Sequence, residues 1–394
     1  MPICCGNISA VVQPTIKPVR KKTISSENSS ERSVRFSPYC EIIESTLFQE
    51  NEPVEYDTFR FVITSIPVES DDEGVPHSFQ EVQINESIIL PKRVVNFVDT
   101  TKEIDSENMT TKTHYLLDVT VLSDNEFQGV KVTEKEFLLA LKFEVKKNPK
   151  LKFLGSVHGF NVTARDHCTS CKIIQNFKDE ESRPFIVIPA IWSNGSEGDH
   201  STNESLDLVA DTHHFEPSRM VLFNLARIGR EVDLSIMSHG VGSRVLMSYA
   251  DHTDDRQVTP LFANIFLVAA DIWEEAFNAR VIAGEEHHEY MVYGGGVGLK
   301  LCKMLKKGGK IHVFHNKWDG TLMISKNIYN GTRRRLGQYG SGSQDSYQRL
   351  HKSTKLKLKD HDCNSFGLVH DYHTHDSIIK IYLDEMFSKQ GKFV

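Results

Sequence analysis

The chain has 394 residues, enough for one large domain with extensions or for two domains of ordinary size. Hydrophobic residues make up 39% of it, which excludes a fully disordered protein and predicts a substantial core. The formal net charge is −7, with Lys and Arg scattered among acids, so we expect no nucleic-acid partner. No apolar run approaches the roughly 18 residues that a membrane span requires, so we expect no membrane-spanning segment.

Residues 1–55 are predicted to be a disordered N-terminal tail, because they are polar, interrupted by prolines and without an amphipathic pattern. One segment of this tail resembles the docking motif for type-1 protein phosphatase, a basic residue followed by Val-x-Phe. The motif residues are Arg32, Val34 and Phe36. The tail is therefore a candidate docking segment for this phosphatase.

The distribution of the cysteines indicates the cellular compartment of the protein. The seven cysteines are far apart along most of the chain, a distribution typical of a reducing environment, and we expect a cytoplasmic protein. Cys4 and Cys5 are adjacent near the N-terminus, and acylation of either would bring the protein to a membrane.

A folded domain is predicted over residues 56–394. Its first part, 56–122, contains strands at 59–66 and 115–122, and an acidic loop at 69–74. In the remainder of the domain, predicted strands alternate with predicted helices. Strands are predicted at 151–157, 185–188, from 234, and at 265–269, 310–314 and 355–359. Helices are predicted at 134–147, 164–177, 218–229, from 244, and at 274–283, 299–306 and 377–387.

This alternation predicts an α/β protein with a mostly parallel central sheet covered by helices on both faces. Residues 338–354, rich in Gly and Ser at their start, are predicted to be a flexible insertion. In such sheets functional groups gather beyond the carboxyl ends of the strands. Those ends are therefore the places to search for a site.

The strand that starts at Leu234 runs into Ser238-His-Gly-Val-Gly242, and a helix follows. This is the strand, sharp turn and helix on which an α/β-hydrolase holds the serine of its G-x-S-x-G pattern. Gly240 falls at the nucleophile position, and it has no side chain that can attack a carbonyl. The turn therefore indicates a hydrolase scaffold without the usual nucleophile.

Residues that match other parts of an α/β-hydrolase site follow three other predicted strands. The segment His158-Gly159-Phe160 follows the strand at 151–157, and backbone amides of such a loop, with that of Val241, can stabilise an oxyanion. Asp319 follows the strand at 310–314, and His370 follows the last strand. Nucleophile, acid and histidine occur in the order that α/β-hydrolases use.

Together these motifs resemble the esterase-like α/β-hydrolases grouped as domain of unknown function 900. The resemblance covers roughly residue 56 to the C-terminus. It is carried by Val157–Asn161, Trp192–Gly195, His239–Leu246, Asp319–Ser325 and His370–Tyr372. It implies an α/β-hydrolase fold in which Asp319 and His370 are the acid and histidine of a triad, and it departs from the family's pattern in having Gly240 where the serine stands.

The function expected from these features is that of a catalytically impaired hydrolase that binds a small acyl- or ester-like ligand or a protein partner. One alternative is an active esterase with a displaced nucleophile, Ser238 or Ser243, or with an activated water. The other is a scaffold for the phosphatase. No cofactor is expected. His370, His373, His375 and Asp376 match no recognised metal-binding pattern, so we expect no metal either.

Overall fold

The computed structural model describes residues 57–65, 68–70, 76–79, 114–122, 127–159, 162–192, 216–254, 258–277, 297–328, 334–341 and 357–388. All of them belong to one compact unit, Glu55–Val394. The predicted tail, with its cysteines and its phosphatase-docking motif, lies outside the described residues, as do Phe160 and positions 342–354 of the predicted insertion. Among the described residues, no helix is both long and apolar enough to cross a bilayer.

Nine described strands form one sheet in the order β11-β10-β9-β8-β6-β7-β1-β4-β5. All neighbours from β11 to β1 are parallel, and β4 pairs antiparallel with both β1 and β5. The predicted mostly parallel sheet is thus confirmed. The strands are β1 Asp57–Thr64, β4 His114–Val121, β5 Phe127–Val132, β6 Lys152–Val157, β7 Phe185–Ile191, β8 Leu234–His239, β9 Ile265–Val268, β10 Ile311–His315 and β11 Leu358–Asp362.

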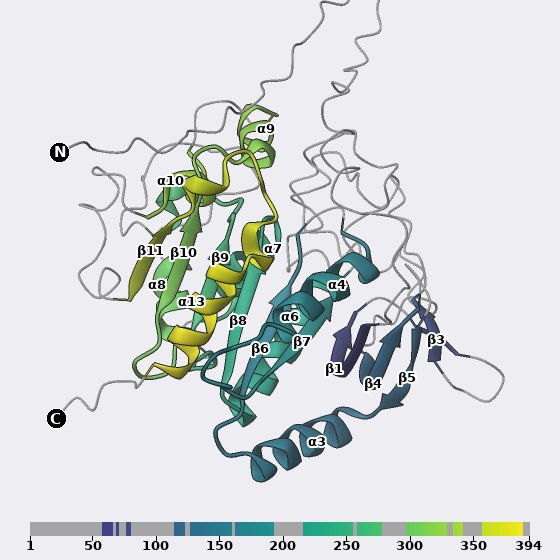
Figure 1. Cartoon of the computed structure of the whole chain (residues 1–394). Helices are drawn as coiled ribbons and strands as arrows, with labels where there is room; N and C mark the ends of the chain where they lie inside the picture. Colours follow the sequence, from purple (N-terminus) through teal and green to yellow (C-terminus); the bar gives the residue numbers. More distant parts are fainter. Residues whose placement is uncertain are drawn as a thin grey trace, which may run out of the picture. The chain divides into compact units, whose positions relative to one another are not determined.

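Helices cover both faces of this sheet, as predicted. One face packs against α3 (Glu134–Lys147), α6 (Glu216–Glu231), α7 (Gly242–His252) and α8 (Val297–Met304), whose apolar side chains belong to one buried cluster. The other face packs against α4 (Ala164–Gln175) and α13 (Asp376–Phe387), which belong to a second cluster. In Figure 1, α13 lies in yellow across β8, β9 and β10. The central strands are therefore buried on both sides, which explains their continuous apolar sequences.

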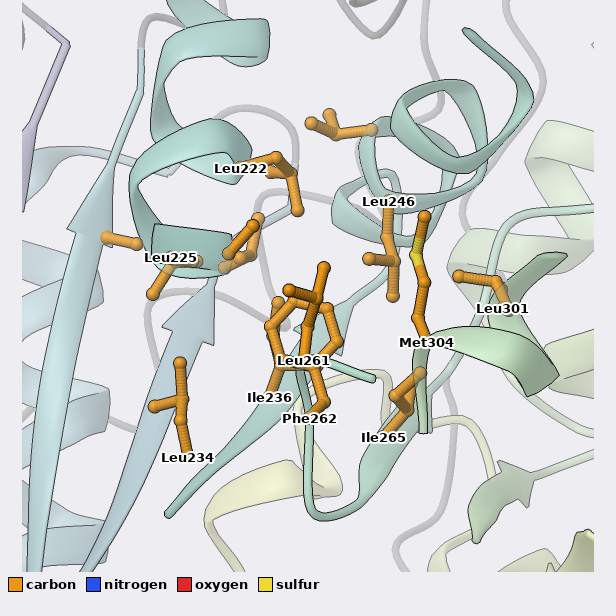
Figure 2. Close-up of a cluster of buried hydrophobic side chains, with 14 of the residues drawn as sticks. Leu222, Leu225, Leu234, Ile236, Leu246, Leu261, Phe262, Ile265, Leu301 and Met304 are labelled. Carbon is orange, nitrogen blue, oxygen red and sulfur yellow. The ribbon is translucent and has the colours of Figure 1, made fainter. Parts of the chain in front are cut away.

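Local signals place the helices where the periodicity predicts them. Thr133 and Glu136 form a capping box at the start of α3, and the Thr163 hydroxyl accepts a hydrogen bond from Asp166 N at the start of α4. Figure 2 shows the result on the first face: Leu222 of α6, Leu246 of α7 and Leu301 of α8 belong to the same cluster as Ile236 and Ile265 of the sheet. This packing anchors the helix that follows Gly240.

The strand order creates a natural position for a site. From β6 the chain crosses to β7 on one side, and it later returns to place β8 on the other side of β6. Loops leaving the carboxyl ends of β6 and β8 therefore diverge, and ligands bind at such switch points in open α/β sheets. Gly159 follows β6 and Gly240 follows β8.

Several elements differ from the sequence-based expectation. Strand β5 was not expected, because Gly129 and its polar neighbours obscure the alternation. The acidic loop begins inside a small antiparallel pair, β2 (Val68–Ser70) and β3 (Pro76–Phe79). The helix expected at 274–283 is, in its described part, a 3₁₀ turn, η2 (Glu274–Phe277), because the chain just before it forms a bridge between Trp273 and Arg335.

The C-terminal part shows two further differences. The predicted insertion begins with the end of a short helix, α10 (Leu336–Tyr339), in which Gln338 is buried. The last strand is Leu358–Asp362 rather than 355–359, because the pairing of Leu358 with Ile311 of β10 sets its register. Helix α9 (Gly320–Ile328) follows β10, and two 3₁₀ turns, η3 (Asn364–Phe366) and η4 (Tyr372–Thr374), follow β11.

Candidate functional site

The turn between β8 and α7 has the geometry of a nucleophile elbow. Gly240 adopts a left-handed backbone with φ of 52°, a conformation that glycine adopts without strain. Its carbonyl accepts hydrogen bonds from Ser243 N at 3.1 Å and from Asp271 N at 3.2 Å. A Cβ at Gly242 would lie 2.5 Å from the carbonyl oxygen of His158, so only glycine lets α7 approach β6 this closely.

Asp319 and His370 come together beside this turn. The Nδ1 of His370 lies 2.8 Å from Asp319 Oδ2, and the other carboxylate oxygen accepts a hydrogen bond from Leu322 N at 2.9 Å. Asp319 is completely buried between β10 and α9, so its carboxylate is held in one orientation. The structure thus joins two residues 51 positions apart that the sequence predicted as an acid–histidine pair.

Gly240 faces the free edge of the same imidazole. A Cβ atom at residue 240 would lie 3.2 Å from His370 Nε2 and 3.9 Å from the Cα of Gly159. A side chain at this position would therefore extend directly toward the nitrogen that accepts the proton in a Ser-His-Asp triad. Three of the predicted site residues, Gly240, Gly159 and His370, are in one place.

The electrostatic environment of His370 suits a proton acceptor. Burial by itself would lower the pKa of this imidazole. The hydrogen bond to Asp319 and the carboxylate charge outweigh burial, so the pKa of His370 is raised above its ordinary value. Because Asp319 accepts from Nδ1–H, the lone pair of the neutral ring lies on Nε2, toward Gly240.

The two serines near the elbow contact each other. Ser238 Oγ lies 3.1 Å from Ser243 Oγ, and both residues are completely buried. Ser238 is in β8 and Ser243 is in the first turn of α7, so neither is at the apex of the turn.

His158 organises the loop after β6 as a neutral side chain. Trp192 N donates to His158 Nε2 at 3.2 Å, so Nδ1 carries the proton and donates to the carbonyl of Gly159 at 2.9 Å. Burial lowers the pKa of His158 to about 4. The Trp192 ring stacks on the imidazole at 5.3 Å between ring centroids. The predicted loop residue His158 therefore has a supporting role.

Val241, the remaining predicted residue, is the N-cap of α7 and is buried. The first amides of a helix have no acceptor within the helix, and they point toward its N-terminal end. In α7 that end is the elbow at Gly240.

A buried ionic network behind the elbow was not predicted from the sequence. Asp271, just beyond β9, accepts hydrogen bonds from Arg244 of α7 and from Ser325 of α9, and it lies 3.1 Å from Arg335 Nε. Burial opposes ionisation, but the two guanidinium groups lower the pKa of this carboxyl below its ordinary value. The sequence signals for this network were Asp271 at the end of a strand and Arg244 just after the elbow. No sequence signal indicated Arg335.

A second unpredicted group lies next to His370. His239, Asp371 and His373 each place one potential metal-ligand atom within 4.8 Å of the others. The set considered from the sequence also contained His373, but joined it to His375 and Asp376. In the structure His375 instead caps α13, accepting a hydrogen bond from Ser377 N.

The strand order, the elbow after β8, the acid after β10 and the histidine after β11 define an α/β-hydrolase. Within this class the chain belongs to the family described as alpha/beta hydrolase of unknown function (DUF900), whose model matches residues 133–384. The resemblance derived from the motifs is thereby confirmed. No curated protein sequence matches the chain.

Solved structures with some likeness include the lin2722 product of Listeria innocua, at 8% identity and a TM-score of 0.36, covering 61% of this chain and 96% of that one. A predicted CIB-like hydrolase from Thermoplasma acidophilum has 11% identity and a TM-score of 0.30, covering 69% and 97%. LpqC, a poly(3-hydroxybutyrate) depolymerase from Bordetella parapertussis, has 12% identity and a TM-score of 0.34, covering 60% and 78%. The fold assignment does not depend on these distant likenesses.

Proposed function

We propose that this chain is a hydrolase-fold protein without a nucleophile, which binds a small acyl- or ester-like ligand and does not form an acyl-enzyme. The observation that carries the proposal is Gly240. A side chain at this position would extend toward His370 Nε2, yet the residue has none, while the Asp319–His370 pair beside it is complete.

The neighbouring serines support the proposal. An attacking hydroxyl must lie within hydrogen-bond reach of the base that takes its proton. The hydroxyls of Ser238 and Ser243 are hydrogen-bonded to each other in the interior. Reaching a substrate would require one of them to leave a completely buried position, so neither replaces the missing serine.

The residues that would bind a ligand follow from the same geometry. The amide of Val241, at the start of α7, can donate to a carbonyl oxygen placed beside Gly240. His370 can donate or accept at Nε2, next to the space that a serine side chain would fill. Such groups orient an ester carbonyl, and without an attacking atom they bind it and leave it intact.

Labelling with a fluorophosphonate, read by intact mass and peptide mapping, tests the proposal. The native protein is expected to stay unlabelled, and Gly240→Ser is expected to label at residue 240. The serine would occupy a left-handed backbone, at a cost of about 1–2 kcal/mol in the free energy of unfolding.

Gly240→Ala and the double variant Gly240→Ser/His370→Ala are the matched controls, and both should stay unlabelled. The first carries the same backbone strain without a hydroxyl, and the second lacks the base. Labelling of the native protein at Ser238 or Ser243 would overturn the proposal and establish a displaced nucleophile.

One observation favours a second function, hydrolysis by an activated water. Residue 240 has no side chain that would lie between a water and His370 Nε2, and Asp319 raises the basicity of the imidazole. His370 would take a proton from this water as it adds to the ester carbonyl, then return the proton to the leaving alcohol. Turnover of short-chain aryl esters that disappears in both His370→Ala and Gly240→Ala would support this function.

A further inference from the structure

Three side chains from two distant segments converge beside His370. His239 is the last residue of β8, while Asp371 and His373 follow the triad-like histidine after β11. His239 Nε2 lies 3.5 Å from Asp371 Oδ1, and all three ligand atoms lie within 4.8 Å of one another. More than 130 residues separate the two segments in sequence, so only the fold creates this group.

A second observation points to a ligand at this place. His373 is 7% exposed, and its Nδ1 is buried without a hydrogen-bond partner among the described residues. Buried nitrogens are rarely left without a partner, so this nitrogen points to a group bound at this place. Asp371, by contrast, has a side chain that is 75% exposed, which gives the group an opening to solvent.

We propose that His239, Asp371 and His373 bind one Zn²⁺ ion. Two imidazoles and one carboxylate form a ligand set typical of zinc sites that keep a fourth position for water. Mg²⁺ and Ca²⁺ prefer oxygen ligands, so they are not expected to compete. This inference departs from the expectation of no metal, which rested on a different set of residues, and it does not depend on the proposed function.

Coordination requires all three side chains of this group to rearrange. Neighbouring ligand atoms of a tetrahedral zinc site lie about 3.3 Å apart, which is less than the 4.8 Å limit of this group. The exposed Asp371 side chain can move inward. The rings of His239 and His373, now 4.2 Å apart and tilted by 30°, must rotate so that both lone pairs point to the ion. His239 Nε2 must also release the carbonyl oxygen of His370, 3.3 Å away.

The bound ion would tie the turn that carries His370 to the end of β8. His370 directly precedes Asp371 in sequence, and its ring lies 4.5 Å from that of His239. Zinc would therefore restrain the imidazole that faces Gly240.

Zinc titration of the full-length protein, stripped with a chelator, tests the inference. Competition against a chromophoric zinc indicator should give one site per chain. Loss of an outer-shell partner of a zinc site weakens binding by about 10–100-fold, so Asp371→Asn and His373→Ala, which remove direct ligands, should weaken it at least tenfold. Asp371 is exposed, so its variant is expected to fold even if the buried His373 variant does not.

The matched controls are His375→Asn and Asp376→Asn, which change the neighbouring histidine and acid outside the group. Asn is a good N-cap residue, so His375→Asn should keep α13 intact. Both controls should bind zinc like the native chain. Co²⁺ should give a tetrahedral d–d spectrum without a thiolate charge-transfer band, which excludes a cysteine site. Zinc affinity unchanged in Asp371→Asn, a thiolate band, or the absence of a one-to-one site would overturn the inference.

Discussion

The Asp319–His370 pair shows how single residues define the candidate site. Asp319 is completely buried, and one of its oxygens accepts from Leu322 N while the other contacts His370. The carboxylate is thus fixed before any ligand arrives, and it holds the imidazole with Nε2 toward Gly240. Removing one charge should therefore change the protonation of the histidine more than its position.

Asp319→Asn is expected to lower the pKa of His370 below its ordinary value. The amide cannot supply the charge that now offsets burial, so burial becomes the dominant influence on the imidazole. An NMR titration of the ring proton resonances of His370 measures the change. Asp371→Asn is the control, because the exposed Asp371 acts only through its charge. A larger fall in the pKa in that control would contradict the assignment of Asp319.

Among the elements, α7 is held closely at its start, where it leaves the elbow. Its start is pressed against the end of β6 at Gly242, and its Arg244 reaches Asp271 beyond β9. Asp271 also contacts Arg335, next to α10, and its amide donates to the carbonyl of Gly240. Packing and a buried ionic network together hold the turn in its left-handed conformation.

Asp271→Asn should lower the free energy of unfolding by about 3–5 kcal/mol, because it removes the buried carboxylate charge that the guanidinium groups of Arg244 and Arg335 both contact. Urea denaturation measures the loss. The control is Asp118→Asn, which removes an exposed ion pair with Arg60 and should cost less than about 1 kcal/mol. Equal losses in the two variants would show that the network does not stabilise the elbow.

Gly242→Ala should displace α7 and destabilise the protein by about 1–3 kcal/mol, the usual cost of overpacking. The new Cβ would lie 2.5 Å from the carbonyl oxygen of His158 and 2.8 Å from that of Val157, and backbone cannot rotate away. Gly159→Ala is the comparison, since its nearest contact would be 3.4 Å. Thermal unfolding of both variants tests whether Gly242→Ala is the more destabilising substitution. An equal or larger loss of stability in Gly159→Ala would refute this prediction.

Over the whole molecule, histidines buried in neutral form make stability depend on pH. Burial lowers the pKa of His158 to about 4 and that of His312 to about 3. The unfolded chain binds protons near pH 6.5, whereas the folded chain does not. The contribution of these two histidines to the free energy of unfolding is thus fully present above pH 6.5. It is lost as the pH falls toward 4, by up to about 1.4 kcal/mol per pH unit for each histidine.

The measurement is the free energy of unfolding at several values between pH 7.5 and 4.5. His312, which packs against Phe266, contributes to the slope of this free energy against pH. His312→Gln should reduce that slope, because glutamine does not titrate. A variant slope as steep as that of the native chain would mean that other groups cause the acid sensitivity.

The sequence by itself determined the class of fold and the order of the motifs. Apolar periodicity, strand–helix alternation and short motifs are local signals, and they placed the elbow at Gly240 and the candidate residues Asp319 and His370 at strand ends. The signals failed where the pattern was interrupted, as at Gly129 in β5, or where an element was as short as η2. The bounds of β11 depended on pairing with β10, which is not a local property.

Only the tertiary structure decided which side chains meet. It turned Gly240 toward His370, paired Ser238 with Ser243, and joined Asp271 to two arginines. It also brought His239 to Asp371 and His373. These contacts depend on the strand order, which places the ends of β8, β9, β10 and β11 next to one another although loops and helices separate them in sequence. Proximity of this kind leaves no periodic signal in the chain.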